Sequence, residues 1–189
     1  MLKLFRAFFT KFLLLFKLRI VNSSEDIYSD DPFFILSKFL DREQVNIIID
    51  GGASIGETTQ RFSKLFPNAL IHAFEPFPDF YSLLKKKAKL NDKIIPYPLG
   101  LGKNDSDVIF HVNKSNGTNS ILASNTRSKE IYGELMQIDH KIKIPITRLD
   151  DIFDINDNQT IDILKLDLQG TELDALIGAS QLLIRGKIN

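Results

Sequence analysis

A glycine-rich segment follows a strongly apolar stretch of the sequence, and an acidic residue stands at its start. The run Val45–Ile49 is apolar except for Asn46 and rich in β-branched residues, which predicts a strand buried on both faces. The segment Asp50–Gly56 comes next and contains three glycines. Glycine lets the backbone turn sharply and lets a ligand approach the main chain. Ser54 and Glu57 have the spacing of a capping box, so a helix with free N–H groups is expected to begin near Ser54.

A second acidic residue ends the next predicted strand. Ala69–Phe74 is expected to form that strand, and Glu75 follows it directly. A carboxylate at this place can accept hydrogen bonds from both ribose hydroxyls of a nucleoside cofactor. Pro76 and Pro78 then fix the exit of the chain from the strand.

The glycine pattern separates two kinds of nucleoside cofactor. A dinucleotide fold needs G-x-G-x-x-G to bring a helix N-terminus onto a pyrophosphate, and here the run from Gly52 reads G-A-S-I-G, without the middle glycine. Asp50 would repel a pyrophosphate but could attract the ammonium group of a methionine moiety. Both points favour S-adenosylmethionine over NAD, and an NAD-dependent reductase is the weaker alternative.

Strands and helices are expected to alternate along the rest of the chain. A helix ends at Pro67, another spans Asp79–Leu90, and the strand Ile94–Leu99 should lie at a sheet edge because its two prolines cannot donate to a ladder. Asp107–Val112 and Lys141–Ile146 alternate as short strands, and Ile161–Leu168 predicts another buried strand. This order predicts an α/β fold with a doubly wound sheet.

A final helix is predicted over Thr171–Ile184, with Gly186 placed to close it. Four of its aliphatic side chains are expected to face inward: Leu173, Leu176, Ile177 and Leu183.

Six stretches of the sequence together carry a resemblance to a known family. They are IIIDGGASIGETT, HAFEPFPDFYSLL, PYPLGLGKNDSDVIF, NGTNSIL, PITRLDDI and IDILKLDLQGTELDALIGA. These stretches resemble the FkbM-type methyltransferases, a family of class I S-adenosylmethionine-dependent enzymes. The resemblance implies a mostly parallel Rossmann-like sheet and O-methylation of a hydroxyl, often on a sugar or on a glycosylated or polyketide product.

The same resemblance assigns cofactor-binding residues. Asp50, Gly52 and Gly56 would line the methionine end with the helix start at Ser54, and Glu75 would hold the ribose. Two further residues, Leu101 and Gly102, would lie near the adenine. Ser120 matches a serine-containing loop near the active site and would contact the substrate.

Methyl transfer to a hydroxyl also needs a group that takes the proton. Asp167 and Glu172 are the candidates, and both are predicted as catalytic residues. Asp167 ends a buried strand, where an idle carboxylate is costly, although it could orient a neighbour instead of acting as the base. Glu172 could instead be an acid in a first helical turn, favoured by the helix dipole.

Histidine and cysteine give no sign of a metal site. His72 lies within a predicted strand and is interpreted as a core residue, and the other two histidines have no ligand spacing around them. The 189-residue chain contains no cysteine, which excludes disulfides and thiolate ligands. No metal is therefore expected.

The first 21 residues carry five basic side chains and no acid, although the whole chain has a net charge of zero. The remainder is mildly acidic, so nucleic acid is not an expected partner. Residues 1–21 predict a basic amphipathic helix that either lies on an anionic membrane surface or packs on protein. Residues 22–32 read as a linker and residues 33–189 as the methyltransferase domain. A cytoplasmic location is expected, with membrane association only if residues 1–21 lie on a membrane.

The family fold continues beyond the last helix of this sequence. The sheet is therefore expected to lack its last strands and to leave Ile161–Leu168 as an open edge, which an oligomer could cover. A non-catalytic fragment or binding module that retains the cofactor half of the fold is the alternative to an active enzyme with a small-molecule or glycan acceptor.

Overall fold

The computed structural model describes residues 31–113, 120–121, 138–154 and 158–188. The chain divides into two compact units, residues 1–41 and residues 42–189. In the first unit, α3 (Pro32–Phe39) begins at the N-cap Asp31, whose carboxylate accepts a hydrogen bond from the Phe33 N–H at 3.0 Å. The expected domain start at residue 33 therefore falls inside α3. Residues 1–21 and most of the expected linker lie outside the described part of the chain.

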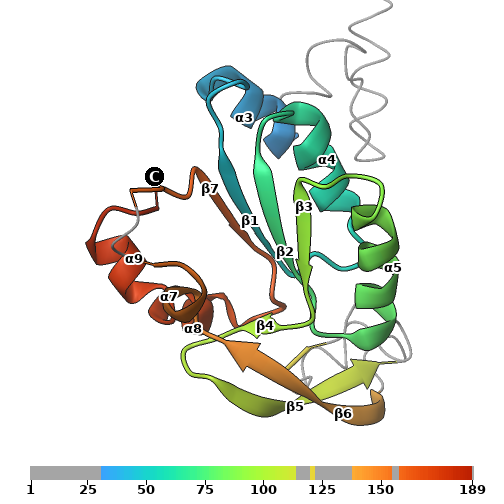
Figure 1. Cartoon of the computed structure of the whole chain (residues 1–189). Helices are drawn as coiled ribbons and strands as arrows, with labels where there is room; N and C mark the ends of the chain where they lie inside the picture. Colours follow the sequence, from blue (N-terminus) through green and yellow to red (C-terminus); the bar gives the residue numbers. More distant parts are fainter. Residues whose placement is uncertain (1–30, 114–119, 122–137, 155–157, 189) are drawn as a thin grey trace, which may run out of the picture. The chain divides into compact units, whose positions relative to one another are not determined.

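The main sheet of the second unit consists of four parallel strands (Figure 1). Their order is β3 (Ile94–Tyr97), β2 (Leu70–Phe74), β1 (Ile47–Gly51) and β7 (Ile163–Leu166). In the register, Gly51 pairs with both Phe74 and Leu166, so the loops after these three strands begin at the same edge of the sheet. The predicted α/β fold with a mostly parallel sheet is confirmed, and β3 is an edge strand.

Helices cover both faces of this sheet (Figure 1). α4 (Glu57–Leu65) and α5 (Pro78–Ala88) lie on one side, where Phe62 and Leu84 are buried. On the other side are α7 (Leu149–Ile152), α8 (Glu172–Ile177) and α9 (Ser180–Ile184). Alternate residues of a strand point to opposite faces, and Ile47 and Ile49 join the apolar cluster formed with these three helices.

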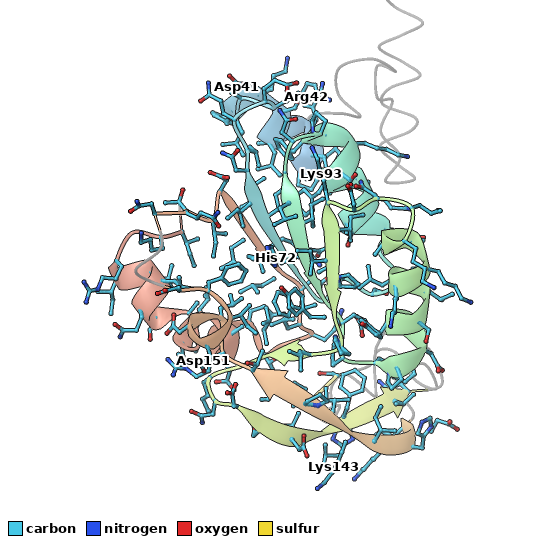
Figure 2. All side chains as sticks on the ribbon, in the orientation of Figure 1. Asp41, Arg42, His72, Lys93, Lys143 and Asp151 are labelled. Carbon is cyan, nitrogen blue, oxygen red and sulfur yellow. The ribbon has the colours of Figure 1, made fainter. Side chains whose placement is uncertain are left out.

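His72 lies beside this apolar cluster, against which Phe153 packs (Figure 2). Its side chain is buried, stacks with Tyr97 and meets Phe153 edge to face. Its Nδ1 lies 2.9 Å from the Tyr97 hydroxyl, and burial lowers the pKa of His72 to about 4. The imidazole is therefore neutral at physiological pH, and the interpretation of His72 as a core histidine is confirmed.

A second sheet lies across the carboxyl ends of the main strands (Figure 1). It has the order β4 (Gly100–Leu101), β6 (Ile138–Thr147) and β5 (Ser106–Asn113), with β5 and β6 antiparallel. The two strands predicted from alternation are thus present, each somewhat longer than expected. Val112 and Ile144, on the inward face, pack with Phe77 and Phe110 into a separate small core.

The predicted single helix at residues 171–184 is wrong in two respects. The structure breaks it into α8 and α9 beside Gly178, where an added Cβ would lie 2.0 Å from the Gly102 carbonyl oxygen. The inward face is also wrong, because Leu173 is 70% exposed. The other side chains expected inward, Leu176, Ile177 and Leu183, are also exposed, whereas Ala175, Ala179 and Leu182 are buried.

Small residues explain why the buried face of residues 171–184 is not the face that was expected. The chain at Gly178 approaches the main chain of Gly102 so closely that only a glycine fits, which turns Ala175 and Ala179 toward the core. Asp150 then caps the first turn of α9: its carboxylate accepts hydrogen bonds from the N–H groups of Gln181 and Leu182, both at 3.1 Å. α9 follows Asp150 in sequence by about thirty residues, so its first N–H groups are capped by a side chain from outside the helix.

Candidate functional site

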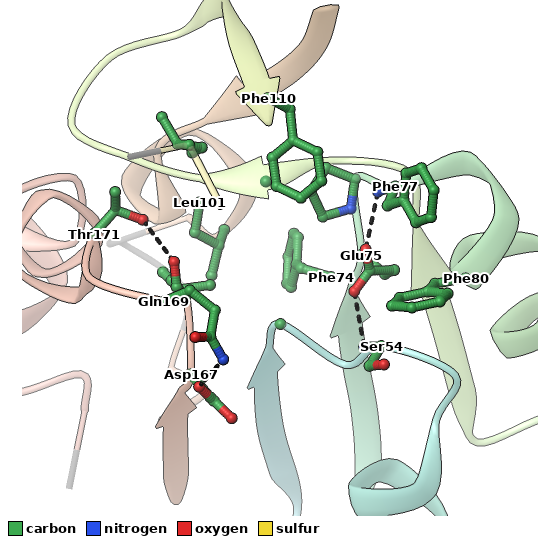
Figure 3. Close-up of a pocket in the computed structure, with 15 residues that line it drawn as sticks. Ser54, Phe74, Glu75, Phe77, Phe80, Leu101, Phe110, Asp167, Gln169 and Thr171 are labelled. Carbon is green, nitrogen blue, oxygen red and sulfur yellow. Dashed lines mark hydrogen bonds between the residues drawn. The ribbon is translucent and has the colours of Figure 1, made fainter. Parts of the chain in front are cut away.

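A cavity of about 210 Å³ opens at the carboxyl ends of β1, β2 and β7, under the second sheet (Figure 3). It is lined by the loops after these strands and by residues of β4 and β5. Its lining residues are Gly52, Ser54, Phe74, Glu75, Pro76, Phe77, Phe80, Gly100, Leu101, Phe110, Ile121, Asp167, Leu168, Gln169 and Thr171.

The glycine-rich segment forms a tight loop against the two neighbouring strand ends. The N–H groups of Gly52 and Ala53 both donate to the Phe74 carbonyl oxygen, at 3.1 and 2.9 Å. Gly52 has a φ of +70°, and a Cβ there would lie 2.0 Å from the Asp167 carbonyl oxygen. The segment therefore needs glycine at this position, because the backbone conformation and the close approach of β7 both exclude a side chain.

The capping box predicted for the following helix is wrong. α4 begins at Glu57, its N-cap is Gly56 with a φ of +83°, and no side chain caps it. Ser54 instead has a φ of +51°, and its N–H donates to Glu75 at 2.8 Å. The loop before α4 is longer than expected, because its N–H groups donate to Phe74 and Glu75 at the end of β2 instead of forming a first helical turn.

Glu75 is held at the cavity wall by both of its carboxylate oxygens. Oε2 accepts the Ser54 N–H at 2.8 Å and Oε1 accepts the Phe77 N–H at 2.9 Å. The residue is only 6% exposed, and burial raises its pKa although these two N–H groups and Lys165 oppose the shift. Each oxygen keeps a further lone pair, so the carboxylate can still accept hydrogen bonds from a ligand.

Asp50 is not brought to the cavity. Its side chain is fully buried, with Oδ2 accepting the Thr59 hydroxyl at 2.7 Å and Oδ1 in an ion pair with Lys165 at 2.9 Å. The position where a ligand ammonium was expected therefore holds the ammonium group of Lys165. The sequence carries a signal for this residue, because a lysine inside a predicted buried strand needs a charged partner.

Asp167 and Gln169 line the opposite end of the cavity. Asp167 follows β7 directly, is exposed, and its Oδ1 lies 3.4 Å from the Gln169 amide nitrogen. Gln169 has a φ of +56°. Asp167 can therefore meet a ligand with its carboxylate, and its catalytic role stays a prediction. The burial expected for it is wrong: Asp167 is exposed, because β7 ends at Leu166 and the chain leaves the sheet there.

Glu172, the other candidate base, faces the backbone instead. Its carboxylate accepts the N–H groups of Leu168 at 2.8 Å and of Gly170 at 3.1 Å. Burial would raise the pKa of Glu172, but the backbone N–H groups together lower it below its usual value. A carboxylate with a lowered pKa is a weak base, and these contacts favour a role in shaping the loop.

Ser120 links the second sheet to the same loop. Its hydroxyl donates to the Gln169 carbonyl oxygen at 2.9 Å, and its backbone pairs with His111 of β5. The neighbouring Ile121 lines the cavity, whereas Ser120 itself does not. Its side chain therefore meets protein at the point where a substrate contact was expected.

Of the remaining predicted cofactor residues, Leu101 lines the cavity and two glycines do not. Gly56 packs on Leu84, and Gly102 packs on Ile146. An aromatic wall of the cavity was not predicted, and its clearest sign in the sequence is the high phenylalanine count of 15. Phe74, Phe77, Phe80 and Phe110 line the cavity, and Phe77 meets Phe80 edge to face with ring centroids 5.1 Å apart.

Among the described residues there is neither a metal-binding cluster nor a membrane-spanning helix. No group of three or more histidine, aspartate or glutamate side chains there could hold a metal ion. No helix in the same residues has the length and apolar character to cross a membrane.

Comparison with protein families gives one match over most of the chain. The family model described as "Methyltransferase FkbM domain" matches residues 50–189. This range begins at the first residue of the glycine-rich segment and includes every residue that lines the cavity.

Three curated proteins are similar over 70–74% of this chain. They are "Methyltransferase 1" of Beauveria bassiana at 26% identity, "2-O-methyltransferase NoeI" of Sinorhizobium fredii at 24%, and "Methyltransferase sdnD" of Sordaria araneosa at 29%. The chain spans 58–60% of their lengths.

A solved structure has a similar fold. The crystal structure of methyltransferase FkbM from Methylobacillus flagellatus aligns with a TM-score of 0.52 at 21% identity. The alignment covers 82% of this chain and 34% of that one. It supports the arrangement of strands and helices described above.

Proposed function

Since the chain belongs to the FkbM methyltransferase domain family, we propose that it binds S-adenosylmethionine in the cavity and directs methyl transfer to a hydroxyl group. The observation that carries the proposal is the geometry of Glu75. Its carboxylate lies in the cavity wall directly beside the glycine-rich loop, fixed by the N–H groups of Ser54 and Phe77.

The cavity has groups that fit each part of this cofactor. The Glu75 oxygens can accept hydrogen bonds from the two ribose hydroxyls, and the faces of Phe77 and Phe110 offer a surface for a flat base. Gly52 has no side chain, so a methionine moiety can approach the main chain. The cofactor supplies a methyl group on a positively charged sulfur, which an acidic cavity favours.

The acceptor is proposed to be a sugar or glycan hydroxyl. Polar side chains gather at the β7 end of the cavity, where Asp167, Gln169 and Thr171 line it. Groups of this kind form hydrogen bonds with hydroxyls, and Asp167 can accept the proton that the acceptor loses. The name of the relative NoeI, a 2-O-methyltransferase, supports an oxygen acceptor for the family.

The roles of the chain's own residues follow from this placement. Glu75 and the glycine-rich loop bind and orient, while the phenylalanines exclude water from the reacting groups. Because a displacement at a methyl group is governed by alignment, positioning by these rigid strand ends would supply most of the rate enhancement.

Calorimetric titration with S-adenosylhomocysteine tests the cofactor proposal. The wild-type chain should bind it, and Glu75→Gln should weaken binding by about tenfold or more, since one charged acceptor is lost. Glu43→Gln is the matched control, because Glu43 is exposed and precedes β1 at the opposite end of the sheet. Absence of binding by the wild type, or equal binding by Glu75→Gln, would reject the proposal.

A further inference from the structure

Lys165 belongs to β7, but its ammonium group reaches the glycine-rich loop. Nζ lies 2.9 Å from Asp50 Oδ1, 3.0 Å from the Gly51 carbonyl oxygen and 2.9 Å from the Gly52 carbonyl oxygen. The ammonium group donates hydrogen bonds to the two loop carbonyls, and Asp50 Oδ1 is its ion-pair partner. The side chain is 23% exposed, so most of it is enclosed by the loop and the neighbouring strand.

The partner of Lys165 is tied in turn to a helix. Asp50 is fully buried, and its second oxygen accepts the Thr59 hydroxyl of α4 at 2.7 Å. A continuous polar chain therefore runs from α4 through β1 to β7, directly behind the loop that lines the cavity. A buried carboxylate without a partner would be costly, so Asp50 holds the ammonium group in place.

Resting on the proposed function, we infer that Lys165 is a positioning residue that fixes the Gly51 and Gly52 carbonyls and so sets the shape of the cofactor loop. Lys165 orients Gly52, which lines the cavity, through a hydrogen bond to its carbonyl. Asp50 serves this lysine rather than an ammonium group of the ligand. The charge of Lys165 also acts on Glu75, where it opposes the effect of burial on the pKa.

Three substitutions separate positioning from simple stabilisation. Lys165→Met removes the donor and leaves Asp50 unpaired. Asp50→Asn combined with Lys165→Met removes both charges but still leaves the two loop carbonyls without their donor. Lys143→Met is the matched control, because Lys143 is exposed on the outer side of β6 (Figure 2). Each full-length protein is titrated with S-adenosylhomocysteine and melted thermally.

The melting temperature and the affinity for S-adenosylhomocysteine should change differently in the double variant. Lys165→Met should lower both the melting temperature and the affinity, the latter by at least about tenfold, because a displaced loop misplaces its ligand. The double variant should regain most of the melting temperature but stay about tenfold weaker in binding. Lys143→Met should match the wild type in both.

Recovery of both properties in the double variant would overturn the inference, since Lys165 would then serve only the ion pair. Unchanged affinity of Lys165→Met would overturn it as well. If neither variant folds, Lys165→Arg decides: its planar guanidinium cannot reproduce the three contacts, so affinity equal to that of the wild type counts against positioning.

Loss of binding in Glu75→Gln, measured in the same series, tests the cofactor proposal separately. Where that loss is seen and Lys165→Met still binds like the wild type, the role of Lys165 fails and the cofactor proposal stands. Where the wild type does not bind, the cofactor proposal itself fails.

Discussion

At the residue scale, two glutamates near the cavity have opposite environments. Glu75 is buried at the end of β2, and burial raises its pKa. Glu172 lies at the start of α8, where burial alone would raise its pKa but backbone N–H groups lower it overall. This difference separates a carboxylate that can meet a ligand from one that shapes a loop, although the sequence presents both as acids beside predicted strand ends.

The raised pKa of Glu75 predicts a pH dependence of stability. A carboxyl group whose pKa is higher in the folded state favours folding while protonated, and that contribution is lost as the pH rises from 4.5 through the raised value. The free energy of unfolding of the wild type, relative to Glu75→Gln, should therefore fall as the pH increases over this window. Urea unfolding of both proteins at several pH values measures it. A difference that stays constant with pH contradicts the assignment.

Asp167 gives a prediction about turnover. With an acceptor that the wild type methylates, chosen from sugars and glycosides, Asp167→Asn should lower kcat by about a hundredfold. Its affinity for S-adenosylhomocysteine should change little, because the cofactor is expected to be held chiefly by Glu75 and the loop. Asp174→Asn serves as the control, because Asp174 is a half-buried acid of α8 that pairs with Lys103 and does not line the cavity. Unchanged kcat in Asp167→Asn would remove it from the proposed mechanism.

At the scale of elements, close backbone contacts decide where helices begin and break. Gly56 starts α4 in a left-handed conformation, and Gly178 separates α8 from α9 where the chain meets Gly102. Neither boundary follows from local helix propensity. Each is set by a contact with a distant part of the chain, which explains why the capping box and the single last helix were wrong.

The contact at Gly178 can be tested by adding one methyl group. Gly178→Ala should lower the free energy of unfolding by about 1–3 kcal/mol, because its Cβ would meet the rigid Gly102 carbonyl. Gly102→Ala should cost less, since its Cβ would meet the flexible end of Ile146. Urea denaturation compares the two, and an equal or smaller loss for Gly178→Ala would argue against the tight contact.

At the scale of the whole molecule, the described residues form a cavity at the carboxyl ends of a sheet whose last strand, β7, is an edge strand. β7 supplies Lys165 from its interior, and the loop after it supplies Asp167. The apolar side chains of α8 and α9 that face outward lie next to this part of the fold. The shape of the cavity wall therefore depends on how firmly β7 and α8 are held in place.

The division of the chain predicts how its two units behave apart. A protein lacking residues 1–41 should keep the melting temperature of the full chain to within a few degrees, because residues 42–189 form a compact unit.

The full chain should sediment with phosphatidylglycerol vesicles through its basic, apolar first 21 residues, and the shortened protein should not. Equal sedimentation of the two proteins would reject membrane binding by residues 1–21.

α3, α7 and β4 were not predicted from the sequence. What the sequence by itself determined is the alternation of strands and helices in the main sheet, the edge position of β3, and the loop and carboxylate that line the cavity. These features are local, because they depend on apolar runs, prolines and glycines that act over a few residues. Only the tertiary structure decided that Asp50 faces Lys165 rather than a ligand, that Ser120 clasps the Gln169 carbonyl, and that the last helix breaks at Gly178. Each of these rests on a contact between residues distant in sequence, which no local pattern encodes.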